Sequence, residues 1–247
     1  MKNLAVFDFD YTIIDDNSDT AVMKLVDENK FSPELKELYK SDGWTKFMQE
    51  VFKVLHDNSV SESDIASLIA NISEVRGLKD LIRKLHDTMG YDVIIISDSN
   101  TYFINLWLKA NNLSSKVLKV FSNPAYFNEQ GLLMINMFHV QDSCKLSTEN
   151  MCKGMIMEDF IKDQSKNSII YDKILYVGDG QNDLCPILRL NNNKALACCR
   201  KNYKCANLIK KIKEGQLRDN DLYGKYEIKA NIFIWETGYD ILEFLIQ

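Results

Sequence analysis

The stretch Leu4-Ala5-Val6-Phe7-Asp8-Phe9-Asp10-Tyr11-Thr12 sets the fold of this chain and the position of its chemistry. A short apolar run that polar residues bring to an end is typical of a buried strand in a parallel sheet. Open α/β sheets bind their ligands at the carboxyl ends of the strands, so we expect Asp8 and Asp10 at a ligand site. The structural alternative is that the two carboxylates only cap a turn.

The same arrangement recurs along the chain, because short apolar runs alternate with longer helical patterns. This alternation is typical of an α/β fold with a parallel sheet. Helical spacing of apolar residues follows Gly77, Asn100 and Lys153. The predicted strands are Leu4–Phe7, Val93–Ile96, Ile174–Val177, Ala195–Ala197 and Ile232–Trp235.

One region departs from the alternation. Residues 17–75 contain four helical patterns and no convincing strand, and the clearest pattern places the apolar residues from Trp44 to Leu55 on one stripe. Two of these helices have recognisable starts, with Ser32 before a proline and Ser61 three positions before an acidic residue. We therefore expect a helical cap at 17–75 above a core formed by 1–16 and 76–247.

Residues 120–150 are less regular than the predicted core around them. Asn123-Pro124 and Glu129-Gln130-Gly131 are turn-forming sequences. They predict a hairpin in this region.

Composition excludes several classes of function. The 247 residues are 46% hydrophobic and 26% charged, as in a compact soluble protein with one sizeable core. Lys and Arg total 30 against 35 Asp and Glu, so no chain-wide cationic surface exists for nucleic acid or anionic lipid. No apolar run is long enough to span a membrane. The cysteines form no C-x-x-C pair, which favours reduced thiols and a cytoplasmic location; they are Cys144, Cys152, Cys185, Cys198, Cys199 and Cys205.

A second acidic cluster follows the predicted strand that ends at Val177. Its sequence, Gly178-Asp179-Gly180-Gln181-Asn182-Asp183, has the first two glycines of a dinucleotide-binding fingerprint but an aspartate at the third position. That aspartate brings negative charge to a site meant for pyrophosphate, so the fingerprint is rejected. Four carboxylates from two strand ends instead suit a magnesium ion, which prefers hard oxygen ligands.

Two further residues have the chemistry of phosphate binding. Ser97 follows the second predicted strand, and Lys153 begins a predicted helix. A hydroxyl donor and a cation of this kind hold the oxygens of a phosphoryl group. Taken singly, Ser97 is also compatible with a helix cap and Lys153 with a solvated surface lysine.

Taken in order, these pieces resemble the haloacid dehalogenase (HAD) superfamily of phosphohydrolases. Its four motifs match Asp8-Phe9-Asp10-Tyr11-Thr12, Ser97, Lys153 and the segment 178–183. The resemblance implies a Rossmann-like parallel sheet flanked by helices, with the helical insertion as a C1 cap after the first strand.

The likeness narrows to the PHOSPHO subfamily, which includes phosphoethanolamine/phosphocholine and pyridoxal phosphate phosphatases, and it runs over essentially the whole chain. It is carried by Asp15-Asp16-Asn17-Ser18-Asp19-Thr20, Ile95-Ile96-Ser97-Asp98-Ser99-Asn100, Phe121-Ser122-Asn123-Pro124-Ala125 and Tyr176–Pro186.

The chain departs from the subfamily pattern at two places. Leu146-Ser147-Thr148 stands where members tend to carry a Cys-Pro, which weakens a metal or redox role for Cys144 and Cys152. Asn202 replaces a usual glycine, and asparagine is able to adopt the positive φ that such a position needs.

The resemblance implies a mechanism. Asp8 becomes an aspartyl-phosphate, and Asp10 protonates the leaving alcohol and later deprotonates the attacking water. Magnesium is held by the Asp8 carboxylate, the Asp10 backbone carbonyl and Asp179, with Asp183 as a more distant or water-mediated ligand. Ser97 and Lys153 balance the phosphoryl oxygens.

Substrate choice is a separate inference from the same likeness, which places Asp19 and Asp98 at the leaving group. Two anions there suit a cationic head such as ethanolamine or choline, and their alternative role is helix capping. Pyridoxal 5'-phosphate is the other candidate. The aromatic ring of Tyr11, Trp44 or Phe47 could stack on the pyridine ring of this substrate. The stripe containing Trp44 and Phe47 is equally compatible with plain core.

The sequence thus predicts a Mg²⁺-dependent phosphatase for a small phosphomonoester. Three alternatives stay open: a phosphoserine-type phosphatase, a module that binds a phosphorylated ligand without turnover, and a zinc-dependent module built on His139, Cys144 and Cys152.

Overall fold

A six-stranded parallel sheet lies at the centre of the computed structural model, which describes residues 2–191, 194–216 and 227–247. Its order is β3-β2-β1-β6-β7-β8, and each neighbouring pair is parallel. All five predicted strands are present, with ends that differ from the prediction by a few residues. The strands are β1 (Lys2–Phe7), β2 (Tyr91–Asn100), β3 (Lys119–Asn123), β6 (Tyr171–Gly178), β7 (Leu196–Arg200) and β8 (Asn231–Trp235).

The strand order fixes where the site forms. The chain passes from β1 to β2 and β3 on one side, and then returns to β6 on the other side of β1. Phe7 pairs with Val177, so β1 and β6 end at the same level. Ligands of doubly wound sheets bind at such a reversal of strand order.

Helices cover both faces of this sheet. Alternate residues of β1 point to opposite faces, so Ala5 and Phe7 join one core while Leu4 and Val6 join the other. None of the described helices is long and apolar enough to span a membrane. One face carries α5 (Leu78–Asp87), α6 (Thr101–Ala110) and α10 (Gly238–Ile246), and the other carries α7 (Lys153–Lys166), α8 (Leu184–Arg189), the short η2 (Gln181–Asp183) and α9 (Lys204–Lys213).

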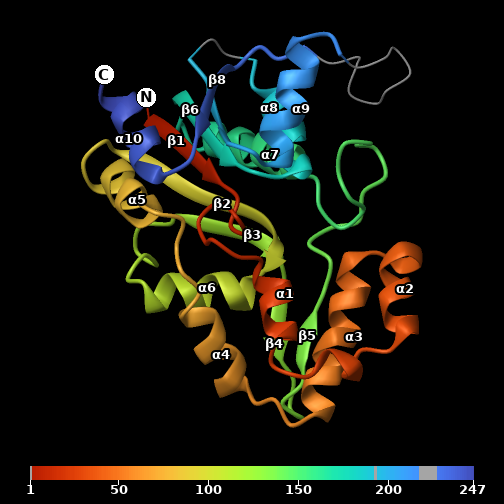
Figure 1. Ribbon diagram of the computed structural model, residues 1–247. Helices are drawn as coiled ribbons and strands as arrows, with labels where there is room; N and C mark the ends of the chain where they lie inside the picture. Colours follow the sequence, from red (N-terminus) through yellow and green to blue (C-terminus); the bar gives the residue numbers. More distant parts are fainter. Residues whose placement is uncertain (1, 192–193, 217–226) are drawn as a thin grey trace.

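The insertion between β1 and β2 is helical, as predicted. Ser32 caps one helix by accepting a hydrogen bond from the Leu35 amide at 3.2 Å, and Ser61 with Asp64 forms the expected capping box. Figure 1 shows α2 and α3 lying together, away from the sheet. The elements are α1 (Ser18–Met23), η1 (Glu28–Lys30), α2 (Pro33–Asp42), α3 (Trp44–Asp57) and α4 (Glu62–Ala70).

The segments that enter and leave the insertion are joined to each other. The Val75 amide donates to the Ile13 carbonyl at 2.9 Å, and the Asp15 amide donates to the Ser73 carbonyl at 2.8 Å. The insertion is therefore tied at its base by backbone hydrogen bonds, close to the predicted boundaries at residues 16 and 76.

The predicted hairpin is formed by β4 (Ala125–Phe127) and β5 (Leu133–Ile135), and it pairs outside the main sheet. Figure 1 shows it beside α3. The side chain of Gln49 on α3 donates to the Leu133 carbonyl at 3.2 Å and accepts from the Ile135 amide at 2.9 Å. The hairpin thus contacts the insertion, although in sequence it falls within 76–247.

Candidate active site

Asp8 and Lys153 form a buried ion pair at the end of β1. The ammonium nitrogen of Lys153 lies 2.6 Å from Asp8 Oδ2, and its side chain is 1% exposed. Lys153 is the first residue of α7, which packs against the sheet and directs the side chain inward. The alternative of a solvated surface lysine is therefore wrong.

Asp183 holds this pair in place. Its Oδ1 accepts from Lys153 Nζ at 2.8 Å and from the Tyr176 hydroxyl at 2.7 Å. Its Oδ2 accepts from the backbone amides of Asp179 and Gly180 at 2.9 and 2.8 Å. With four donors, this fully buried carboxylate organises the loop after β6.

Three carboxylates meet at the reversal of strand order. Oxygens of Asp8, Asp179 and Asp183 lie within 4.8 Å of one another, and all three residues are buried. Thr12 donates its hydroxyl hydrogen to Asp179 Oδ1 at 3.2 Å. This set of hard, anionic oxygens fits a divalent cation such as Mg²⁺.

Burial and the closeness of other charged groups shift the pKa values of the carboxylates and of Lys153 in this cluster. Burial raises the pKa of Asp8 to about 6, against the lowering effect of Lys153. Burial and the neighbouring Asp8 raise the pKa of Asp179 to about 8. Burial disfavours the charged form of Lys153, but Asp183 and Asp8 outweigh it and raise the pKa of the ammonium. A bound cation would relieve the repulsion among the carboxylates.

Asp10 lies apart from this cluster and is held by the start of the insertion. Its Oδ1 accepts from the Ser18 amide at 2.9 Å and its Oδ2 from the Asn17 side chain at 3.2 Å. Burial and the neighbouring Asp19 raise its pKa well above the usual range. A raised pKa favours the protonated form of this carboxyl, which is the form that can donate a proton.

Ser97 lies at the site end of β2 and is 1% exposed. Its hydroxyl oxygen accepts from the Ser99 amide at 3.3 Å, which leaves its hydrogen to donate. Asn100, not Ser97 or Asp98, caps α6. The capping alternative for these two residues is therefore wrong.

Asp19 lies in α1 and is 1% exposed. Its Oδ2 accepts from the indole Nε1 of Trp44 at 2.7 Å, and its Oδ1 accepts from Asn100 at 3.5 Å. Burial raises its pKa to about 7, against the lowering effect of the Trp44 hydrogen bond. Asn17 caps α1, so Asp19 is not the helix cap either.

Asp98 lines a cavity of about 560 Å³ in front of Asp179. Two amide side chains position its carboxylate, Asn150 at 3.1 Å and Asn182 at 2.9 Å. Tyr11 and Tyr203 also line this cavity, with ring centroids 5.8 Å apart. The cavity therefore offers two aromatic rings and the carboxylates of Asp98 and Asp179, and Lys145 and Lys204 also line it.

Sequence reasoning missed several of these positions. Thr12 was quoted in the first motif without a role, and Tyr176 was assigned only to a strand. Asn182 stands inside the motif 178–183 without an assigned role, and Asn150 and Tyr203 have no periodic or spacing signal that points to the cavity. Their roles come from contacts across the fold.

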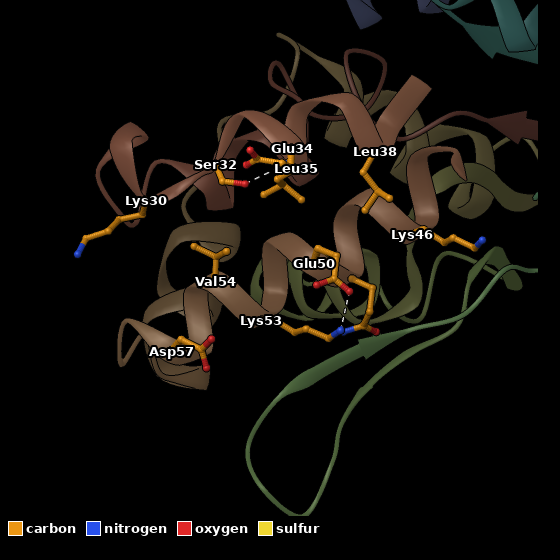
Figure 2. Close-up of a pocket in the computed structure, with 11 residues that line it drawn as sticks. Lys30, Ser32, Glu34, Leu35, Leu38, Lys46, Glu50, Lys53, Val54 and Asp57 are labelled. Carbon is orange, nitrogen blue, oxygen red and sulfur yellow. Dashed lines mark hydrogen bonds and ion pairs between the residues drawn. The ribbon is translucent and has the colours of Figure 1, made fainter. Parts of the chain in front are cut away.

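A larger cavity of about 640 Å³ lies elsewhere, between η1, α2 and α3. Figure 2 shows that its lining mixes cations, acids and aliphatic side chains, including the paired Glu50 and Lys53. No carboxylate of the cluster at the sheet edge lines it. The larger of these two cavities is therefore not the one that lies beside the buried carboxylates.

The parallel sheet, its reversal at β1 and β6 and the buried carboxylates with Lys153 define a phosphatase of the HAD superfamily. A solved structure with the description "Phospho-Aspartyl Intermediate Analogue of Phosphoserine phosphatase" has the same fold. Its TM-score is 0.58 at 19% identity, with 98% of each chain covered.

Sequence comparison gives the narrower assignment. The model of the family described as "Putative Phosphatase" matches residues 3–247, and the chain belongs to this family, within its PHOSPHO group. It is 36% identical to the human protein named "Pyridoxal phosphate phosphatase PHOSPHO2", with both chains fully covered. It is 29% identical to the human "Phosphoethanolamine/phosphocholine phosphatase", over 99% of this chain and 88% of that one.

Proposed function

We propose that this chain is a Mg²⁺-dependent phosphomonoesterase that forms an aspartyl-phosphate on Asp8. The observation that carries the proposal is the buried Asp8 carboxylate, which lies 2.6 Å from the Lys153 ammonium and beside Asp179 and Asp183. An anion held next to a fixed cation at a strand end is placed to meet a phosphoryl group.

The other residues have complementary roles. Lys153 and the Ser97 hydroxyl neutralise the phosphoryl oxygens as Asp8 attacks phosphorus. Asp10 gives its proton to the departing oxygen, and its raised pKa supports this role. The Asp10 carboxylate then takes a proton from the water that hydrolyses the aspartyl-phosphate.

Asp8 and Asp179 would hold the metal directly, because Asp183 already has four donors within the protein. The Asp10 backbone carbonyl is the further protein ligand that the family likeness suggests. When bound, Mg²⁺ supplies positive charge that offsets the carboxylates and lets an anionic phosphate enter.

The proposed substrate is a small phosphomonoester, with pyridoxal 5'-phosphate as the first candidate. Tyr11 and Tyr203 line the cavity and offer faces for a pyridine ring. The human relative with that activity in its name aligns over the full length of both chains.

Phosphoethanolamine or phosphocholine is the second candidate. Asp98 lines the same cavity, and Asp19 lies close enough for their charges to interact. Two carboxylates favour a cationic head and disfavour a polyanionic nucleotide. The proposed location is cytoplasmic, which the six free cysteines support.

Turnover is tested by magnesium-dependent release of phosphate from para-nitrophenyl phosphate. Asp8→Asn is expected to abolish release while the protein stays folded. Asp172→Asn is the matched control, because this β6 carboxylate pairs with exposed Lys194 outside the site. A folded wild-type protein without turnover would instead indicate a phospholigand-binding module.

Substrate preference is tested with a kinetic panel of pyridoxal 5'-phosphate, phosphoethanolamine, phosphocholine and phosphoserine. Tyr203→Leu is expected to raise KM for pyridoxal 5'-phosphate by about tenfold. Asp98→Asn and Asp19→Asn are expected to raise KM mainly for the two amine substrates. If all variants keep the wild-type ranking, both assignments of the cavity are wrong.

A further inference from the structure

Three cysteine sulfurs meet near the start of α7, whose first residue is Lys153. Cys185 Sγ lies 3.4 Å from Cys144 Sγ and 3.6 Å from Cys152 Sγ, and all three sulfurs lie within 4.8 Å of one another. They come from the loop before α7, the residue that precedes α7, and α8. We call them the thiol cluster.

The spacing of the sulfurs is compatible with a tetrahedral metal site. A tetrahedral zinc ion binds thiolate sulfur at about 2.3 Å, which places sulfurs about 3.8 Å from each other. The two closest separations in the thiol cluster differ from this value by a few tenths of an ångström. The third separation, between Cys144 and Cys152, is within 4.8 Å, so the three sulfurs lie close enough together to share one ion.

The surrounding charges also fit. Three thiolates and one Zn²⁺ leave a net charge of about −1. Arg189 donates from Nε to Cys185 Sγ at 3.3 Å, and its Nη2 lies 4.0 Å from Cys152 Sγ. N–H groups around bound thiolates orient the ligands and offset their charge.

His139 is not part of the cluster, although the zinc alternative from sequence included it. Its Nε2 accepts a hydrogen bond from the Cys152 amide at 2.9 Å and so faces the backbone. The third ligand comes instead from Cys185, which is distant in sequence. Ser147 also contacts the cluster, with its hydroxyl oxygen 3.4 Å from Cys144 Sγ.

We propose that Cys144, Cys152 and Cys185 bind one Zn²⁺, with water or the Ser147 hydroxyl as the fourth ligand. The three thiols release their protons to solvent as the ion binds. Cys144 is only partly buried, so the ion has a route from solvent.

The bound ion would have a structural role, because it would connect three segments of the chain. Cys152 directly precedes Lys153, and Cys185 follows shortly after Asp183, so the ion would join the starts of α7 and α8. Through Cys144 it would also hold the loop whose Leu146, Ser147 and Thr148 line the 560 Å³ cavity. The inference does not depend on the proposed substrate.

The first test is metal binding by the reduced full-length protein with excess Mg²⁺ present. We expect one equivalent of zinc by elemental analysis and a higher thermal midpoint with zinc than without it. Co²⁺ in place of zinc is expected to give thiolate-to-cobalt charge-transfer absorption, which carboxylate ligands do not give. A reduced wild-type protein that takes up no zinc and shows no such absorption would overturn the proposal.

Variants then locate the ligands. Cys185→Ser and Cys144→Ser are each expected to weaken zinc binding by at least about 100-fold and to remove the charge-transfer band. Cys199→Ser is the control, since this thiol is as buried as that of Cys185 but contacts only one other sulfur, that of Cys205 at 3.6 Å, among the described contacts. If the control loses zinc as readily as Cys144→Ser, or if only a disulfide forms within the cluster, the assignment fails.

Discussion

Gly178 lies against the carboxyl group of Asp183 so closely that a Cβ on Gly178 would come within 2.4 Å of Asp183 Cγ. Asp183 is fully buried and held by four donors, so it has no space to retreat. The glycine at the end of β6 is therefore required for the position of the carboxylate that orients Lys153.

Gly178→Ala is expected to lower kcat/KM by about 100-fold and stability by about 1–3 kcal/mol. Gly180→Ala is the matched control, because its Cβ meets only the end of the Asn182 side chain at close range, at 2.7 Å. Steady-state kinetics and urea unfolding measure the two effects. Equal losses in the two variants would show that Asp183 is not the cause.

Lys153→Met tests the buried cation. The substitution leaves Asp8 and Asp183 without their shared partner, so we expect a stability loss of about 3–5 kcal/mol and a fall in kcat of about 1000-fold. Lys166→Met is the control on the same helix, since Lys166 pairs with Asp163 on the surface, where solvent screens the ion pair and little effect on stability is expected. Activity within tenfold of wild type in Lys153→Met would contradict the role of this lysine.

Stability without metal is expected to fall as pH rises from about 5 to about 8. The folded protein has pKa values of about 6 for Asp8, about 7 for Asp19 and about 8 for Asp179. The unfolded chain has the usual aspartate value of about 3.9. The folded state therefore binds more protons in this range, and raising the pH favours unfolding.

Thermal unfolding measured in EDTA and in Mg²⁺ at several pH values tests this expected dependence of stability on pH. Magnesium is expected to stabilise more at pH 8 than at pH 5, because protons compete for the same carboxylates. Asp179→Asn is expected to flatten the profile measured in EDTA. Greater stability at pH 8 than at pH 5 without metal would contradict the assignment.

Trp44→Phe tests the charge state of Asp19. Loss of the indole hydrogen bond removes an interaction that lowers the pKa of Asp19, so this pKa is expected to rise above about 7. Less of the carboxylate is then charged at pH 7. If the cavity accepts an amine, KM for phosphoethanolamine rises about threefold at pH 7 and recovers at pH 8.5. An equal change for para-nitrophenyl phosphate would indicate a general structural effect instead.

Asn202 has a φ of 67°, in agreement with the expectation from sequence that this asparagine can adopt a positive φ. Asn202→Gly is expected to change stability by only a few tenths of a kcal/mol, and Asn202→Val to cost about 1–2 kcal/mol. Urea unfolding separates the two outcomes. A neutral valine would show that the positive φ is not maintained in solution.

The sequence was sufficient for features that depend on neighbouring residues. The presence of five of the strands, the helix caps at Ser32 and Ser61, and the placement of Asp8 and Asp179 after strands follow from local patterns, because a strand and the turn after it are adjacent in sequence. Strand β3 was missed, since Lys119–Asn123 carries only two apolar residues at the sheet edge.

Contacts between elements that are distant in sequence could not be predicted from local sequence patterns. Trp44 reaches Asp19 from another helix, and Cys185 joins Cys144 and Cys152 only because α8 packs on α7. Neither contact has a spacing signature. Similarly, the hairpin was predicted, but its packing on α3 was not.

The backbone bonds at the base of the insertion have a consequence for how the chain folds. Phe7 pairs with Ile95 in the parallel sheet, a partner about 90 residues away, and such distant contacts slow folding. Once Ile13 and Val75 are joined, the open loop between β1 and β2 shortens to about 26 residues, which lowers its closure cost by about 1 kcal/mol. The helical insertion, if it forms first, converts a long-range strand pairing into a nearly local one.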